Sequence, residues 1–114
     1  MKILFVENHA VFAQTVTAKF LCDHQVEIVS SISGAWTAIV ANRFDVVLVD
    51  YDLDDGKGDQ LVRGIRGQNL PVRIVGVSSH DDGNAAIRQA GADEICSKTN
   101  FADIGSVLRR LVPE

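Results

Sequence analysis

Residues 46–49 are the most constraining segment of this 114-residue sequence, because four consecutive aliphatic side chains, Val-Val-Leu-Val, lead directly into Asp50. A strand with one face in water alternates apolar and polar residues, whereas a strand covered on both faces is apolar throughout. The run therefore predicts a central strand with helices on both sides of its sheet. It also places Asp50 at the carboxyl end of that strand.

Four other short apolar runs have the character of strands, and helix-like stretches separate them. The predicted strands are residues 2–6, 26–29, 46–49, 72–77 and 94–97. Apolar residues between and after them recur every three or four positions, as in amphipathic helices, and the second stretch presents Trp36, Ile39 and Val40 as its core side. Strict alternation requires parallel strands joined by right-handed crossovers. We therefore predict an α/β fold with a doubly wound parallel sheet and helices on both faces.

Composition narrows the class of protein. With 46% hydrophobic residues the chain can form one core, so residues 1–114 are interpreted as a single domain. The net charge of −4 and the scattered basic residues argue against direct nucleic-acid binding. Neither a signal peptide nor a membrane-spanning run is evident, so we expect a cytoplasmic protein without a membrane partner. Cys22 and Cys96 lie in apolar stretches and are expected to be buried thiols.

Polar side chains follow several of the predicted strands at the point where each strand ends. Glu7 and Asn8 follow the first strand, Asp50 the third, Ser78 the fourth and Lys98 the fifth. In an open parallel sheet, ligands bind beyond the carboxyl ends of the strands. We therefore expect these side chains to form one site.

The acidic residues at this edge indicate a divalent cation and phosphoryl chemistry. Neighbouring carboxylates raise one another's pKa unless a cation holds them ionised. Mg²⁺ prefers oxygen ligands, which Glu7, Asn8 and Asp50 offer. A carboxylate can act as a nucleophile and form an acyl phosphate, and an ammonium group such as that of Lys98 can bind phosphoryl oxygens. Asp50 is the predicted nucleophile.

Three segments in order along the chain resemble the receiver domain of two-component response regulators. They are Val6-Glu7-Asn8-His9, Val47-Leu48-Val49-Asp50 with Gly56 and Gly58 following, and Gln89-Ala90-Gly91-Ala92-Asp93 leading to Ser97-Lys98. The resemblance covers essentially the whole chain. It implies a (βα)5 fold with strand order 2-1-3-4-5, Mg²⁺ as cofactor, and phosphorylation of Asp50 by a histidine kinase or phosphotransfer protein.

The resemblance also assigns roles to individual residues. Asp50 would be phosphoacceptor and metal ligand, Asn8 would hold the direct metal-ligand position, and Glu7 would act mainly through water. The backbone carbonyl of Asp52 would complete the metal ligands, and Lys98 would contact the phosphoryl group. The family accepts phosphoryl groups and is not enzymatic apart from autodephosphorylation. It is compatible with a homodimer and with an output domain, fused or separate.

Three positions depart from the family pattern. Asn8 replaces the second acid of the first turn and supplies no negative charge. Gly76 stands where a switch Ser or Thr is usual, so Ser78 and Ser79 are the nearest hydroxyl groups, and Ile95 replaces the usual aromatic residue. Two hypotheses follow: a phosphorylated receiver that switches a surface formed by the last two helices and the last strand, or a pseudo-receiver that acts as a phosphorylation-independent interaction module.

The loop after Asp50 allows a further, less favoured interpretation. Asp50-Tyr51-Asp52 has the form of the DxD motif of haloacid-dehalogenase-type phosphatases, but that motif usually lies on the first strand, and 114 residues leave little room for the rest of that fold.

The other acids of this loop have separate interpretations. The Asp52 side chain follows two residues beyond the acceptor, where it could steer the attacking water. Asp54 and Asp55 are interpreted as a solvated turn.

Overall fold

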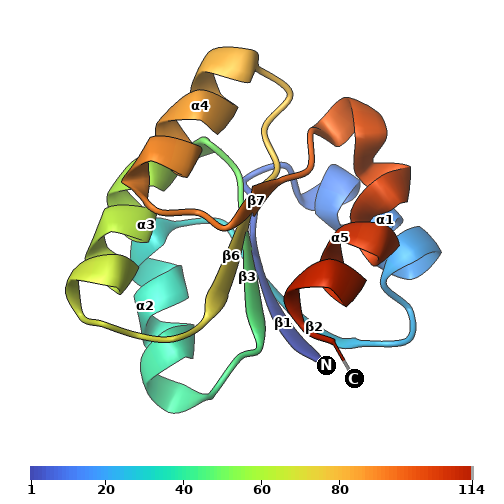
Figure 1. The fold of residues 1–114 in the computed structure, drawn as a ribbon, viewed down its shortest axis with the longest axis horizontal. Helices are drawn as coiled ribbons and strands as arrows, with labels where there is room; N and C mark the ends of the chain where they lie inside the picture. Colours follow the sequence, from blue (N-terminus) through green and yellow to red (C-terminus); the bar gives the residue numbers. More distant parts are fainter. Residues whose placement is uncertain (114) are drawn as a thin grey trace.

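The computed structural model describes residues 1–113 and contains a five-stranded parallel sheet between two layers of helices (Figure 1). The strands of this sheet are β1 (Lys2–Val6), β2 (Gln25–Val29), β3 (Val46–Val49), β6 (Arg73–Gly76) and β7 (Glu94–Ile95). The helices are α1 (Ala10–Phe20), α2 (Ile32–Ala41), α3 (Gly58–Gly67), α4 (Asp81–Ala90) and α5 (Ile104–Leu111), and a 3₁₀ helix, η1 (Lys98–Asp103), leads into α5. The strand order is β2-β1-β3-β6-β7, which confirms the predicted order 2-1-3-4-5.

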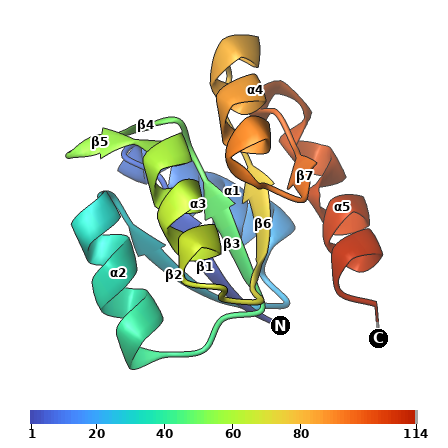
Figure 2. The same ribbon diagram turned by 60° about the vertical axis from the view of Figure 1, so that its left-hand side comes forward.

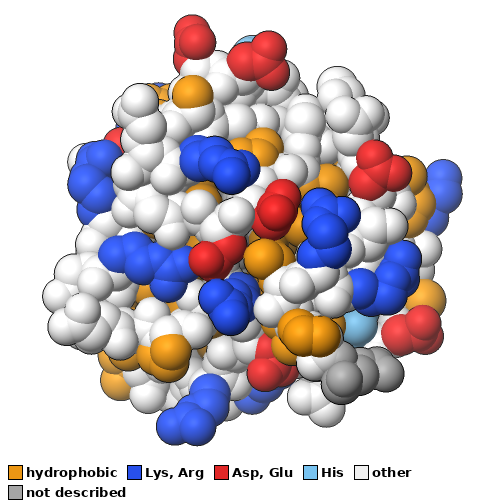
Figure 3. Space-filling view, viewed as in Figure 1, with side chains coloured by type: hydrophobic (Ala, Val, Ile, Leu, Met, Phe, Trp, Pro, Cys, Tyr) orange, Lys and Arg blue, Asp and Glu red, His pale blue; other side chains and the backbone are white. Residues whose placement is uncertain are grey.

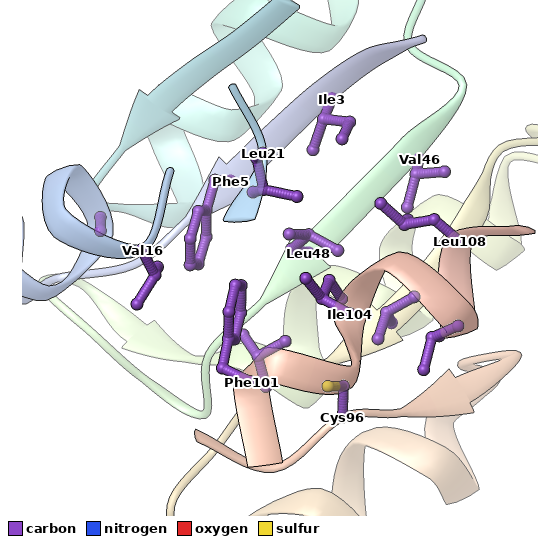
Figure 4. Packing of buried hydrophobic residues seen from close by; sticks show 14 residues of the cluster. Ile3, Phe5, Val16, Leu21, Val46, Leu48, Cys96, Phe101, Ile104 and Leu108 are labelled. Carbon is purple, nitrogen blue, oxygen red and sulfur yellow. The ribbon is translucent and has the colours of Figure 1, made fainter. Parts of the chain in front are cut away.

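The two faces of β3 explain why residues 46–49 are all apolar. Val46 and Leu48 belong to the core beneath α1 and α5, and Val47 and Val49 belong to the core beneath α2, α3 and α4. None of the four exposes any surface, since each has a relative exposure of 0%. Leu48 lies among Phe5, Phe101 and Ile104 on the α5 side (Figure 4). The predicted central, doubly covered strand is confirmed, because β3 pairs with β1 on one side and β6 on the other.

A small hairpin after β3 was not predicted. Its strands β4 (Asp52–Leu53) and β5 (Gly56–Lys57) are antiparallel and stand beside the start of α3 (Figure 2). Leu53 is buried in the core shared with α2 and α3, which anchors the hairpin to the domain. The loop after Asp50 is therefore an ordered structure with its own hydrogen-bonded pairing.

Helix α2 packs through smaller residues than the sequence indicated. Ala35 and Ala38 face the core, whereas Val40 is 84% exposed, so its predicted inward orientation was wrong. Trp36 is half-buried and lies against α3, where a Cβ on Gly64 would approach its ring to 2.9 Å. Because α2 is apolar almost throughout, hydrophobic periodicity alone did not distinguish its core side from its exposed side.

The two cysteines differ in environment. Cys96 is buried, and this burial raises the pKa of its thiol. Cys22, expected to be buried, is exposed just after α1. Cys22 lies at the surface beyond the end of α1, whereas its neighbour Leu21 is buried in the core.

Acidic and basic side chains are interspersed on the face that carries β7 (Figure 3). Ion pairs connect neighbouring elements there: Arg66 Nη2 lies 2.8 Å from Asp93 Oδ2, and Arg110 Nη2 lies 3.5 Å from Glu94 Oε1. This face therefore offers no continuous basic patch to a nucleic acid. No helix within residues 1–113 has the length and apolar character required to cross a bilayer.

Candidate functional site

The sheet brings Glu7, Asp50 and Lys98 to one edge through backbone hydrogen bonds between neighbouring strand ends. Asp50 N–H donates to the carbonyl of Val6 (2.9 Å), and Glu7 N–H donates to the carbonyl of Val29 (2.9 Å). Lys98 N–H donates to the carbonyl of Ser78 (3.2 Å). These bonds set the positions from which the three charged side chains meet.

The Lys98 ammonium lies between the two carboxylates. Its Nζ is 2.9 Å from Glu7 Oε1 and 3.3 Å from Asp50 Oδ2. Glu7 and Asp50 are buried, with relative exposures of 1% and 4%, and the Lys98 side chain is only 14% exposed. A lysine that is shielded from water in this way interacts strongly with both acids, since the local dielectric is low.

Glu7 is the most perturbed acid of this site. Burial raises the pKa of its carboxyl from 4.5 to about 7, and the nearby Asp50 charge adds to the increase. The Lys98 ammonium and the His9 backbone N–H, which donates to Glu7 Oε2 at 3.1 Å, act in the opposite direction but do not overcome the desolvation. The ionised form of the Glu7 carboxyl is therefore poorly stabilised by the protein alone.

Asn8 supplies an oxygen atom that the protein leaves unpaired. Its Oδ1 is buried and has no hydrogen-bond partner among the described residues. A buried acceptor without a partner is costly, so such an atom is suited to an external ligand. Like the Glu7 and Asp50 carboxylates, it is an oxygen atom of the kind that Mg²⁺ prefers as a ligand. No cluster of three or more His, Cys, Asp or Glu side chains suited to a metal occurs within residues 1–113.

The Asp52 side chain is paired within the β4–β5 hairpin. Its carboxylate forms an ion pair with Lys57 across the β4–β5 hairpin, and this contact lowers the pKa of Asp52. Lys57 Nζ also lies over the ring of Tyr51, 5.1 Å from its centroid. The Asp52 carboxylate, predicted to be free to steer water, is thus held by a lysine, and its backbone carbonyl remains the group that the metal-ligand role requires.

Asp55 has a structural role that the sequence did not reveal. Asp55 lies in the predicted exposed turn, and its carboxylate also accepts hydrogen bonds from the first backbone N–H groups of α2, Ile32 N at 2.6 Å and Ser33 N at 3.1 Å. These bonds lower the pKa of Asp55. The two donors lie 23 and 22 positions earlier in the chain, so no local pattern could identify the contact. Asp55 thereby ties the loop after Asp50 to α2.

Ser78 lies near the site but is held by other groups. It is buried, and its Oγ accepts a hydrogen bond from His80 N–H at 3.1 Å. The buried side chain of Asn84 accepts from Ser78 N–H (2.9 Å) and donates to the Ser78 carbonyl (3.0 Å). Within residues 1–113, no hydrogen bond joins the Ser78 hydroxyl to Asp50 or Lys98. The two hydrogen bonds between the Asn84 side chain and the Ser78 backbone were not predicted, because an Asn in the first turns of a helix is ordinarily a surface residue.

Hydrophobic atoms fill the space beside Gly76, where a switch hydroxyl is usual in the family. A Cβ at Gly76 would lie 2.6 Å from Ile95 Cδ1 and 2.9 Å from Ile87 Cγ2. Both distances are below normal contact, so even a methyl group requires these side chains to move. Ile95, which replaces the usual aromatic residue, is therefore packed over the position of the missing hydroxyl.

We expect Gly76→Ala to lower the free energy of unfolding by about 1 kcal/mol, because the added methyl overpacks this corner. The double variant G76A/I95V should recover part of the loss, since valine lacks the Cδ1 atom that the new methyl meets. Urea denaturation of the two variants and of I95V measures the coupling. Additive effects of the two substitutions would contradict this packing.

Pockets lie at both ends of the sheet. One of about 610 Å³ is lined by residues such as Val40, Phe44 and Leu70, at the opposite end of the sheet from Asp50. Another, of about 460 Å³, includes Glu7 and Gln14 among its lining residues and lies at the carboxyl edge. The charged groups that can perform chemistry are at this edge, so size does not identify the site here.

The model of the family described as response regulator receiver domain matches residues 3–109 of this chain. Among characterised proteins, the chain is 29% identical over 118 aligned residues to protein RcaC of Microchaete diplosiphon, covering 96% of this chain and 18% of RcaC. It is 26% identical over 85 residues to the probable transcriptional regulatory protein NarL of Mycobacterium tuberculosis, covering 72% of this chain and 39% of NarL. The chain thus spans well under half the length of these relatives.

Solved structures share the fold at lower sequence identity. A putative response regulator from Chloroflexus aurantiacus superposes with a TM-score of 0.87 at 18% identity, covering 99% of this chain and 98% of that one. Response regulator protein TrrA from Thermotoga maritima, in complex with Mg²⁺–BeF, gives a TM-score of 0.87 at 17% identity, covering 97% and 98%. These likenesses establish the architecture of the domain.

Proposed function

The chain belongs to the response regulator receiver domain family of two-component systems, and from that premise we propose that Asp50 accepts a phosphoryl group from a histidine kinase or phosphotransfer protein. The observation that carries this proposal is the buried Asp50 carboxylate held 3.3 Å from the Lys98 ammonium beside Glu7. A carboxylate at a sheet edge with an adjacent cation is suited to act as a nucleophile toward phosphorus.

In the proposed reaction, an Asp50 carboxylate oxygen attacks the phosphorus of a phosphohistidine. A P–O bond forms, the P–N bond breaks, and the imidazole leaves with its electron pair and gains a proton. Lys98 would then bind oxygens of the transferred phosphoryl group as a point charge. The protein thereby stores the phosphoryl group as an acyl phosphate and acts as an acceptor rather than as an enzyme.

Four residues would hold the Mg²⁺ cofactor: Asn8 through its unpaired oxygen, Asp50 directly, Glu7 mainly through water, and Asp52 through its backbone carbonyl. When bound, Mg²⁺ neutralises charge on the phosphoryl group and on the acids around it. The raised pKa of Glu7 and the buried, unpaired Asn8 oxygen support this assignment, because both groups are poorly satisfied by the protein alone.

The test is phosphorylation of the chain by acetyl phosphate with millimolar Mg²⁺, followed by intact mass spectrometry. We expect the wild type to gain one phosphoryl group and Asp50→Asn to gain none. Asp54→Asn is the matched control, because it removes a carboxylate from the same loop. The Asp54 side chain makes no hydrogen bond among the described residues. An unmodified wild type, or a modified D50N, would refute the proposal.

A second candidate is a pseudo-receiver that binds a protein partner without phosphorylation. The packing of Ile95 and Ile87 beside Gly76 favours it, since that corner leaves no room for a switch hydroxyl. Calorimetry separates the two functions: the receiver takes up Mg²⁺ and then beryllofluoride, which mimics the phosphoryl group. The pseudo-receiver takes up neither.

A further inference from the structure

The Lys98 ammonium has an aromatic neighbour in addition to its two acids. Its Nζ lies over the ring of Phe12, 4.9 Å from the ring centroid. A cation within about 6 Å of an aromatic centroid is attracted by the negative face of the ring, and more strongly where water is excluded. Because the Lys98 side chain is only 14% exposed, water is largely excluded from this contact.

The ring of Phe12 is held in place by an aromatic cluster. It packs edge-to-face against Phe5 at 6.5 Å and against Phe101 at 5.8 Å, with interplanar angles of 82° in both cases. Phe5 and Phe101 stack on each other at 5.8 Å, as the close-up of the core shows (Figure 4). Phe12 comes from α1, Phe5 from β1 and Phe101 from η1, so three elements fix the ring beneath the lysine.

We propose that Phe12 is a positioning residue for Lys98, whose ring holds the ammonium at the phosphoryl site. This inference rests on the proposed function of Asp50. One of the two acids beside Lys98 changes during that reaction, because Asp50 becomes an acyl phosphate. The Phe12 ring carries no charge and is unchanged by this step. It therefore supplies a constant attraction that keeps the ammonium in place while the Asp50 carboxylate is converted.

The alternative is that Phe12 only fills the core, and two substitutions at this position separate the roles. Phe12→Leu keeps an apolar side chain but removes the aromatic face, whereas Phe12→Tyr keeps the face. Phe20→Leu is the matched control, because Phe20 also packs on Phe101, at 6.1 Å, but carries a different cation, Lys19, over its ring. F12L and F20L therefore perturb the same cluster, and only F12L removes the contact with Lys98.

We expect F12L to slow phosphorylation of Asp50 by acetyl phosphate, and to weaken beryllofluoride binding, by about fivefold. F12Y should remain within about twofold of the wild type, and F20L should match the wild type under conditions where both are fully folded. An equal loss of phosphorylation in F20L, or a loss in F12Y as large as in F12L, would overturn the proposal.

A spectroscopic readout tests the contact without any phosphoryl donor. The ring current of Phe12 should shift the NMR signals of the Lys98 side-chain methylene groups nearest Nζ. We expect this shift to persist in F12Y and F20L and to disappear in F12L. If the wild type took up no phosphoryl group, the function proposed for Asp50 would fail, while a shift lost only in F12L would still support positioning. Unchanged Lys98 signals in F12L would refute it.

Discussion

Gly58→Ala is expected to destabilise the domain by about 3 kcal/mol, among the largest effects of adding one methyl group to this chain. A Cβ at Gly58 would lie 2.1 Å from the carbonyl oxygen of Asp50 and 2.9 Å from Val49 Cγ1. The first of these atoms is backbone and cannot rotate away. The Gly58 N–H also donates to the Tyr51 carbonyl at 2.6 Å, so displacement of the chain at Gly58 would also move the loop that follows Asp50.

Gly67→Ala is the matched control in the same helix. No atom lies within 4 Å of a Cβ at Gly67, and its backbone has no positive φ. Alanine in a compatible helical position stabilises by about 0.5–1 kcal/mol, because it restricts the unfolded chain. The free energy of unfolding measured by urea denaturation should therefore fall for G58A and rise for G67A. Equal changes would show that Gly58 is an ordinary helical glycine, and phosphorylation of folded G58A measures the displacement of Asp50.

Glu7→Gln is expected to raise the free energy of unfolding by about 2 kcal/mol at pH 8. Burial raises the pKa of Glu7 to about 7 in the folded state, against an ordinary value of 4.5 in the unfolded chain. Between these two pH values the folded protein binds more protons than the unfolded chain. The stability of the wild type therefore falls as the pH rises toward 7, and it levels off above 7. Glutamine is neutral throughout and avoids this loss.

Denaturation of wild type and E7Q from pH 4.5 to 8 measures this effect. The free energies of unfolding of the two proteins should be most similar at pH 4.5 and should diverge as the pH rises. The wild type should be the less stable protein at every pH above 5. Mg²⁺ should reduce the gap at pH 8, because a cation that binds only the folded state stabilises it. Parallel curves would mean that Glu7 is already ionised in the folded protein at pH 5.

The meeting of the charged side chains at one sheet edge could be predicted from sequence, but the residues that support them could not. Glu7, Asp50 and Lys98 were placed together because parallel strands end at one edge, and the structure brings their side chains into contact. The role of Asp55 depends on donors at the start of α2, and that of Asn84 on the end of β6. Such contacts follow from how elements pack, which hydrophobic periodicity does not encode.

The sequence alone determined the sheet, its order of elements and the edge that carries the acids. These properties are local: periodicities of two and 3.6 define strands and helices, and an apolar run defines a strand buried on both faces. Three features depend instead on how the elements pack: Ile95 fills the space beside Gly76, Val40 faces outward, and Phe12 lies under Lys98. Close packing is established between whole elements, because residues distant in sequence compete for the same volume.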